Sequence, residues 1–283
     1  MSLFTLSAFT DEYGASPDEQ FSALRQTGIP LMELRSLNGV NVSELTAADI
    51  SALAARAKDE GVAFSAIGSP IGKIPLDGGI TVHLELAERI FTFASMLGTG
   101  FVRIFSFYPP KAGTREDRFE KTAALLRQLT ALAGKFGLTL CHENEAGIFG
   151  ESPEDELRLL QAVPELRTVF DMGNFMLSGY DPLSAFDLLK DKIAYFHIKD
   201  GNARGEIYPP TCGEAKIEEL LTRYRNEVGK AAILTLEPHL CDFAVLSSLT
   251  KEKYETPYRF RDAKEAFLFA AGAVENLLKR IDP

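Results

Sequence analysis

The sequence predicts an α/β protein, a single (β/α)8 TIM barrel built from parallel strands. Eight short apolar runs alternate with longer segments in which apolar residues recur every three or four positions. The chain has 283 residues, close to the length that one such barrel uses. Polar residues also gather where the last four runs end, the edge at which these barrels place their reactive groups.

Each of the eight runs has the length and composition of a barrel strand. The predicted strands cover residues 3–9, 29–34, 62–67, 101–107, 138–143, 168–172, 193–198 and 231–237. Gly28, Gly61 and Gly137 stand shortly before the second, third and fifth runs, where the C-cap of a preceding helix belongs.

Helix starts are marked by hydroxyl residues that are followed three positions later by an acid. These N-cap candidates are Ser16, Thr46, Thr114 and Ser152. In this pattern the hydroxyl accepts a hydrogen bond from the helix backbone, and the acid can return one to the N–H of the cap. Pro17 and Pro153 follow two of the caps, at the first helical position that proline favours.

The last part of the chain, from about residue 240 to 283, is expected to complete the barrel with a loop and a helix over roughly 258–281. The whole of 1–283 is thus interpreted as one domain. The loop is longer than a strand–helix connection requires. It can cover the site, contact a partner subunit or lie on the surface.

Composition limits the classes of function. The net charge of −10 disfavours a broad nucleic-acid surface, because phosphate binding depends on clustered Lys and Arg, although a local basic pocket can still hold an anionic substrate. No apolar run is long enough to span a membrane, and the N-terminus does not read as a signal peptide. The three cysteines lie far apart, which argues against a disulfide framework. We expect a cytoplasmic protein and leave homo-oligomerisation open.

The strongest functional signal lies at the ends of the last four predicted strands. These ends carry Glu143, Asp171, His197 and Glu237. Neighbouring strands lie about 4.8 Å apart, so inward side chains at one level on successive strands can converge. Each residue alone would be interpreted as a solvated, capping or hydrogen-bonding group, but converging carboxylates repel one another unless a cation joins them. The set predicts a divalent metal ion, and its oxygen-rich chemistry suits Mn, Co, Mg or Zn.

Other polar residues near the strand ends are predicted to contact the substrate or to support the ligands. The expected substrate contacts are Lys73, Arg103, His142, Asn174, Lys199 and Arg204. Glu145 and His239 are expected to orient the ligands, since metal-binding side chains commonly need such partners. Solvated surface charges or ion pairs are the alternative. Arg103 fits that alternative least, because its flanks are apolar.

Eight motifs together resemble the xylose isomerase-like TIM barrel superfamily, in particular its sugar phosphate isomerase/epimerase branch. In order, they are SAFTDE, MELR, SAIGSPIGK, RIFSF, CHENE, FDMGN, FHIKD and LEPHL. The resemblance implies a metal held by the four strand-end residues. It also implies a proton exchanged at the substrate carbon by Glu143 and Glu237, as in the ketose 3-epimerases. Those relatives usually have D-x-x-H on the sixth strand, whereas here Asn174 follows Asp171, and an amide cannot shuttle a proton.

The expected function is a metal-dependent sugar or sugar-phosphate isomerase or epimerase. It would abstract a proton next to a carbonyl and pass through an enediolate, with Glu143 and Glu237 as the catalytic pair. An inosose-type dehydratase on the same metal site is the alternative enzyme. A metal-dependent endonuclease fits poorly with the acidic charge and the few histidines. A non-catalytic sugar-binding barrel would need no metal and would tolerate changes at all four strand ends.

Overall fold

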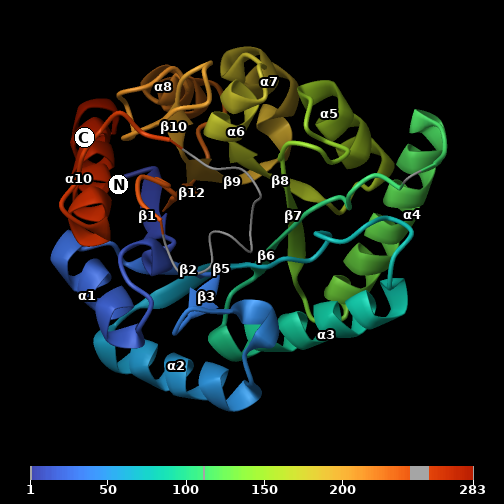
Figure 1. Cartoon of the computed structure of the whole chain (residues 1–283), viewed down its shortest axis with the longest axis horizontal. Coiled ribbons are helices and arrows are strands. Elements are labelled where there is room, and N and C mark those ends of the chain that lie inside the picture. The colour runs from blue at the N-terminus through green and yellow to red at the C-terminus, as the bar shows by residue number, and fades with distance from the viewer. Residues whose placement is uncertain (1, 111, 243–254, 283) are drawn as a thin grey trace.

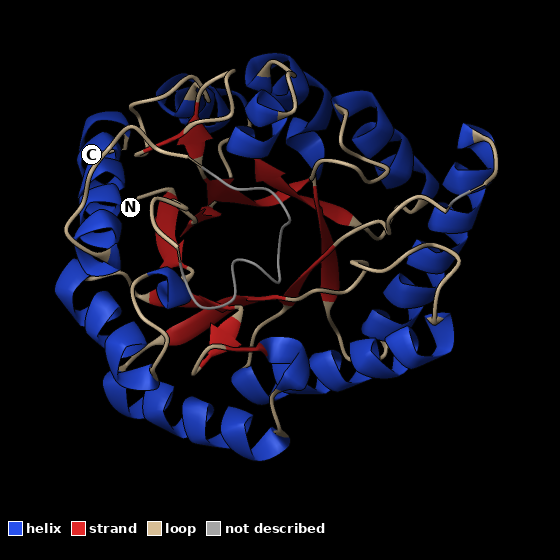
Figure 2. Ribbon diagram, viewed as in Figure 1, coloured by secondary structure: helices blue, strands red, loops and turns tan. Residues whose placement is uncertain are grey.

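The computed structural model describes residues 2–110, 112–242 and 255–282. Eight parallel strands form a closed barrel, and helices surround it as an outer layer (Figure 1; Figure 2). The order around the barrel is β1-β12-β9-β8-β7-β6-β5-β2, so each strand lies beside the next barrel strand along the chain. The predicted (β/α)8 fold is confirmed.

Each predicted run overlaps one barrel strand. The strands are β1 (Phe4–Ala8), β2 (Leu31–Leu34), β5 (Ala63–Gly68), β6 (Phe101–Ile104), β7 (Thr139–Glu143), β8 (Arg167–Asp171), β9 (Ile193–Ile198) and β12 (Ala232–Leu236). Two antiparallel pairs lie outside the barrel: β3 (Ser36–Leu37) with β4 (Val40–Asn41), and β10 (Asp200–Gly201) with β11 (Ile207–Tyr208). The expected strand over 101–107 was too long. β6 ends at Ile104, because the next amide, that of Phe105, bonds to the carbonyl of Ile71 in a neighbouring loop.

The helices follow the predicted order and caps. They are α1 (Pro17–Thr27), α2 (Ala47–Glu60), α3 (Ile80–Leu97), α4 (Arg115–Gly134), α5 (Pro153–Ala162), α6 (Met172–Leu177), α7 (Pro182–Leu189), α8 (Ile217–Glu227) and α10 (Ala263–Ile281). Short 3-10 turns are η1 (Thr10–Glu12), η2 (Val42–Glu44) and η3 (Lys190–Lys192). Ser16, Thr46 and Thr114 form complete capping boxes, and Ser152 accepts the N–H of Asp155.

The C-terminal helix is shorter than expected. α10 begins at Ala263 and not near residue 258, because the side chain of Asp262 caps it by accepting the N–H of Glu265 at 2.9 Å. Residues 243–254 of the expected loop lie outside the described residues. None of the helices in the described part of the chain is long and apolar enough to cross a membrane.

Strand alternation separates the interior of the barrel from the layer between strands and helices. Cys141, Val169, Tyr195 and Ala66 form a small buried cluster of their own, distinct from the large core. On β7, β8 and β9 the residues two positions further on are Glu143, Asp171 and His197. Because successive side chains alternate between faces, these residues share the inner face and lie one layer nearer the C-terminal rim.

The loop after β5 packs against the chain after β6 with almost no space between them. Gly72 has a φ of +91°, and a Cβ at this position would lie 2.0 Å from the carbonyl oxygen of Phe105. The amide of Gly72 donates to Nε2 of His83 at 2.7 Å, which ties the loop to α3. The backbone that carries Lys73 toward the rim is therefore fixed on two sides.

Gly72→Ala should lower the free energy of unfolding by about 3 kcal/mol, because a left-handed conformation and a backbone clash add together. Gly61→Ala is the matched control. Gly61 also has a positive φ, +68°, but a Cβ there meets nothing within 4 Å. It should lose only about 1 kcal/mol. Denaturant titration of both variants measures the difference, and equal losses would show that Gly72 is not sterically constrained.

Candidate metal centre

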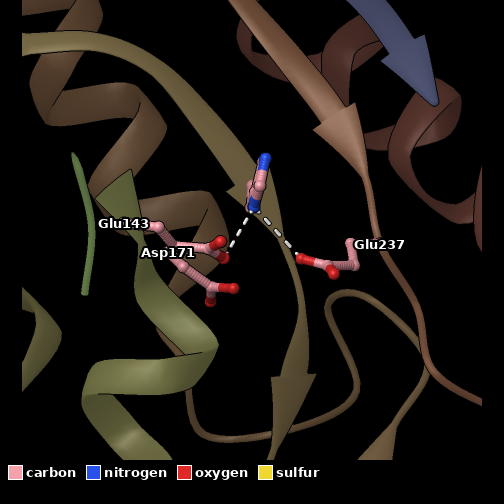
Figure 3. Close-up of side chains that lie close together, drawn as sticks. Glu143, Asp171 and Glu237 are labelled. Atoms are coloured by element: carbon pink, nitrogen blue, oxygen red, sulfur yellow. Dashed lines mark hydrogen bonds and ion pairs between the residues drawn. The ribbon is translucent and has the colours of Figure 1, made fainter. Parts of the chain in front are cut away.

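The four predicted ligands come together at the C-terminal rim of the barrel. Glu143 ends β7, Asp171 ends β8, His197 lies in β9 and Glu237 follows β12. One ligand atom from each lies within 4.8 Å of the others, and all four side chains are buried. Glu143 and Asp171 lie together, across the centre from Glu237 (Figure 3). Nδ1 of His197 is 2.8 Å from Oε1 of Glu143 and 3.1 Å from Oε2 of Glu237.

This donor set fits a divalent metal ion. Three carboxylates and one imidazole are the ligands that ions such as manganese or zinc accept. Oε2 of Glu237 is buried and receives no well-aligned hydrogen bond from the described residues, although Nδ1 of His197 lies 3.1 Å and Nζ of Lys199 3.4 Å from it. A buried carboxylate oxygen in this state favours a cation in the centre.

Charge at the centre is balanced in part by His197. Burial alone would lower the pKa of this imidazole, but Glu143, Glu33 and Glu237 raise it well above its ordinary value. A proton on His197 therefore supplies positive charge when no metal is bound. A metal ion would have to displace that proton, since an imidazole binds metals in its neutral form.

Two buried arginines each hold one oxygen of a glutamate. Nη1 of Arg103 lies 2.7 Å from Oε2 of Glu143, and Nη1 of Arg35 lies 2.9 Å from Oε1 of Glu237. Burial would raise the pKa of Glu143, but His197 and Arg103 reverse the effect and lower it. The remaining oxygen of each glutamate lies beside Nδ1 of His197, at the shared centre.

Lys199, from the FHIKD motif, joins the same rim. Its Nζ lies 3.0 Å from Oδ2 of Asp171 and 3.4 Å from Oε2 of Glu237. It also donates to Oδ1 of Asn174 at 3.1 Å. Burial raises the pKa of Asp171 to about 6 even though Lys199 opposes that shift. Lys199 and Asn174 thus lie where the sequence placed them, beside the ligand cluster.

Glu33 on β2 is a site residue that the sequence reasoning did not assign. It is 1% exposed and lies 3.3 Å from Nε2 of His197, on the opposite side of the ring from the ligand cluster. Its Oε1 also accepts the hydroxyl of Tyr195 at 2.9 Å. A carboxylate at Nε2 directs Nδ1 toward the centre, as a partner of a metal-binding histidine does. The sequence offered one indication of this role, because Glu33 is an acid next to apolar residues in the MELR motif.

A second cluster borders Glu237. Arg35 bonds both oxygens of Asp11 and also contacts Glu12 at 3.2 Å. Nε2 of His239 lies 3.2 Å from Glu237, and the amide of His239 donates to Glu12 at 2.8 Å. Burial raises the pKa of Glu12 to about 8 and, helped by Lys199, lowers that of His239 to about 4. His239 does lie beside a predicted ligand, but Arg35 already supplies a cation to this group.

His142 does not join the centre. Its Nδ1 lies 2.5 Å from Oε2 of Glu156 on α5, and both side chains are fully buried. Since Glu143 faces the barrel interior, the preceding residue must face the helices. The expected substrate contact by His142 therefore requires correction: this side chain lies on the outer face of β7.

Three further predicted residues form ion pairs around the rim. Nζ of Lys73 lies 2.9 Å from Oε1 of Glu145 and 4.3 Å from the centre of the Phe105 ring. Glu145 thus contacts Lys73 and is not among the four residues of the ligand cluster, so its expected role toward a metal ligand stays a prediction. Arg204 is 76% exposed, between β10 and β11, and contacts Glu206. The structure does not bring Arg204 to the cluster.

Known proteins resemble this chain in sequence and in fold. The inosose dehydratase of Lacticaseibacillus casei is 29% identical over 97 residues. This stretch covers 34% of this chain and 33% of that protein, so the match spans about a third of the relative's length. The structure of L-ribulose 3-epimerase has a TM-score of 0.76 at 19% identity, with 99% of this chain and 96% of that chain covered.

The structure of the IOLI protein with a binding zinc atom has a TM-score of 0.76 at 14% identity, with 99% of each chain covered. Likenesses at such identities concern the fold alone. The family model described as xylose isomerase-like TIM barrel matches residues 21–239. Since this match covers more than half of the chain, the protein belongs to the xylose isomerase-like TIM barrel family.

Proposed function

We propose that this protein is a metal-dependent enzyme that removes a proton next to the carbonyl of a sugar or a related polyhydroxy ketone. One observation carries the proposal. Glu143 and Glu237 lie on opposite sides of one buried centre, and each has one oxygen bound by an arginine and the other beside Nδ1 of His197. Two carboxylates in this arrangement can act on opposite faces of a substrate carbon.

Glu143, Asp171, His197 and Glu237 would hold a divalent metal such as Mn, Co, Mg or Zn. When bound, such an ion supplies Lewis-acid chemistry that polarises the substrate carbonyl. The carboxylate of Glu143 or Glu237 accepts the proton from the neighbouring carbon, and the C–H electrons pass to the carbonyl as the enediolate forms. Return of the proton to the other face gives epimerisation, and return to the other carbon gives aldose–ketose isomerisation.

Dehydration is the second candidate, and Lys199 favours it. Its ammonium group lies 3.0 Å from Asp171 and 3.4 Å from Glu237, beside the carboxylates that would take the first proton. From there it can transfer a proton to a β-hydroxyl, which leaves as water when the enediolate expels it and the C–O bond breaks, and Lys199 is left neutral until it regains a proton. The similarity to inosose dehydratase supports this outcome.

Three interpretations remain predictions from the sequence. They are the single domain over 1–283, the cytoplasmic location and a homo-oligomer as a possible partner state. Nucleic acid stays disfavoured by the net charge of −10.

The protein purified without chelator should carry about one divalent ion per chain. His197→Ala and Asp171→Ala should each weaken manganese or cobalt binding by about a hundredfold, whereas Glu88→Ala, on an exposed face of α3, should not. Affinity should rise with pH, because His197 has to lose its proton before it binds. Elemental analysis and calorimetric titration test this. Undiminished binding by His197→Ala would exclude the centre.

Glu33→Ala should weaken cobalt binding by about tenfold or more, because the imidazole of His197 loses the partner that orients it. Glu33→Gln keeps a hydrogen-bond acceptor and should recover part of the affinity. Tyr195→Phe is the control, since it removes the other bond to Glu33 and leaves the contact with His197. Calorimetry and the visible spectrum of the cobalt form report the change. Wild-type affinity and spectrum in Glu33→Ala would rule out this positioning role.

The reaction itself is tested with inososes and ketoses in deuterated water. NMR should show either deuterium at the carbon next to the carbonyl, for epimerisation or isomerisation, or an unsaturated product that has lost water. Glu143→Gln and Glu237→Gln should each lower turnover by about a hundredfold while metal binding falls only modestly. Glu154→Gln, exposed on α5, is the control. Turnover within about threefold of wild type in both variants would exclude proton transfer by this pair.

A further inference from the structure

We infer that the substrate is an uncharged polyhydroxy ketone and not a sugar phosphate. This inference deepens the function proposed above and rests on it. Two groups of contacts lead to it: the ion pairs of the cations around the centre, and the backbone amides of the loops that follow β9 and β12.

Four cations beside the centre are each matched by a carboxylate of the protein. Arg103 contacts Glu143, and Lys73 contacts Glu145. Lys199 contacts Asp171 and Glu237, and Arg35 contacts Asp11, Glu12 and Glu237. A phosphate would have to compete with these carboxylates for each cation. In a site that binds an anion, by contrast, the cations are available to the ligand.

The carboxylates also outnumber these cations. The acids are Asp11, Glu12, Glu33, Glu143, Glu145, Asp171 and Glu237, and the permanent cations are Arg35, Lys73, Arg103 and Lys199. Burial raises the pKa of Glu12 to about 8, so this acid is mostly protonated near neutral pH, and a divalent metal ion would cancel the remaining excess of negative charge without making the centre positive. A phosphate group would add up to about two further negative charges to a buried site, where repulsion is screened only weakly.

In the loop after β9, the seventh barrel strand, one carboxylate of the protein binds three backbone amides. In barrels of this kind the loops after the seventh and eighth strands frequently bind phosphate. Here the carboxylate of Asp200, 1% exposed, accepts the amides of Gly201 at 2.8 Å, Gly213 at 3.0 Å and Ala215 at 3.0 Å. A side chain of the protein thus occupies the donors that would otherwise bind an anion.

The described part of the loop after β12 shows the same arrangement. Residue 238 is a proline and has no N–H to donate. The amide of His239 donates to Oε2 of Glu12 at 2.8 Å, and that of Glu237 donates to the carbonyl of Ile198 at 3.2 Å. Protein acceptors therefore take the amides of Glu237 and His239, as Asp200 takes three amides in the loop after β9.

The donors that remain suit neutral oxygens. Arg103 is 3% exposed, and its buried Nε and Nη2 have no hydrogen-bond partner among the described residues. Since the charge of this guanidinium is matched by Glu143, its remaining N–H groups favour hydroxyl or carbonyl oxygens, which accept hydrogen bonds without adding charge. An uncharged ring or chain with several hydroxyl groups and one carbonyl meets these requirements.

Manganese-loaded protein is titrated in a calorimeter with an inosose, a ketohexose and the phosphate ester of each. We expect at least one uncharged ketone to bind about tenfold or more tightly than its phosphate ester. Its affinity should change by less than about twofold between low and physiological salt, because no ligand charge is screened. Both measurements use the intact protein and require no variant.

Tighter binding of a phosphate ester, or no saturable binding of either uncharged ketone, would overturn the inference. A steep loss of affinity with added salt would do the same. Binding of an uncharged ketone without conversion in the deuterium experiment would leave the inference standing and remove the proposed reaction. The two failures are therefore distinguishable.

Discussion

The centre depends on two buried guanidinium groups, each of which binds one oxygen of a glutamate on opposite sides of the barrel. Arg103 and Arg35 both lie against the ring of Phe9, at 5.6 Å and 4.1 Å from its centre, so one aromatic side chain contacts both cations. A glutamate without such a partner would be expensive to bury and free to rotate. With one oxygen bound, the other has a defined direction toward His197.

Barrel closure makes this arrangement possible. β2 and β9 are far apart in the sequence and are not neighbours in the sheet, yet Glu33 on one contacts His197 on the other across the interior. His197 is therefore held between an acid on one side of its ring and the ligand acids on the other. Its ring also lies edge-on to Phe9 and to Tyr195, which restricts rotation further. Rigid support of this kind gives a metal ligand its geometry before any ion arrives.

The sequence was sufficient for the strand order and for the convergence of the four strand-end residues that we propose as metal ligands. Parallel strands all end at the same rim, so a polar residue after each apolar run locates that rim without knowledge of the fold's details. The sequence did not show on which face of β7 the side chain of His142 lies, because a shift of one residue along a strand moves a side chain to the other face. It also could not reveal that Glu33 contacts His197, since that contact exists only after the barrel closes. Arg204 resembled a loop cation at the site, but the hairpin of β10 and β11 turns it outward to solvent.

Asp200 gives one residue of the FHIKD motif a significance beyond this chain. Its carboxylate accepts hydrogen bonds from three loop amides, as a bound anion would. A family member with a small neutral residue at this position would leave the same amides without this acceptor, beside the strand that carries His197. One side chain would then distinguish two kinds of barrel. In one kind the loop amides can bind an anionic group of the substrate, and in the other a carboxylate of the protein already binds them. Relatives could then differ in the charge of their substrates while the strands that carry the proposed metal ligands stay the same.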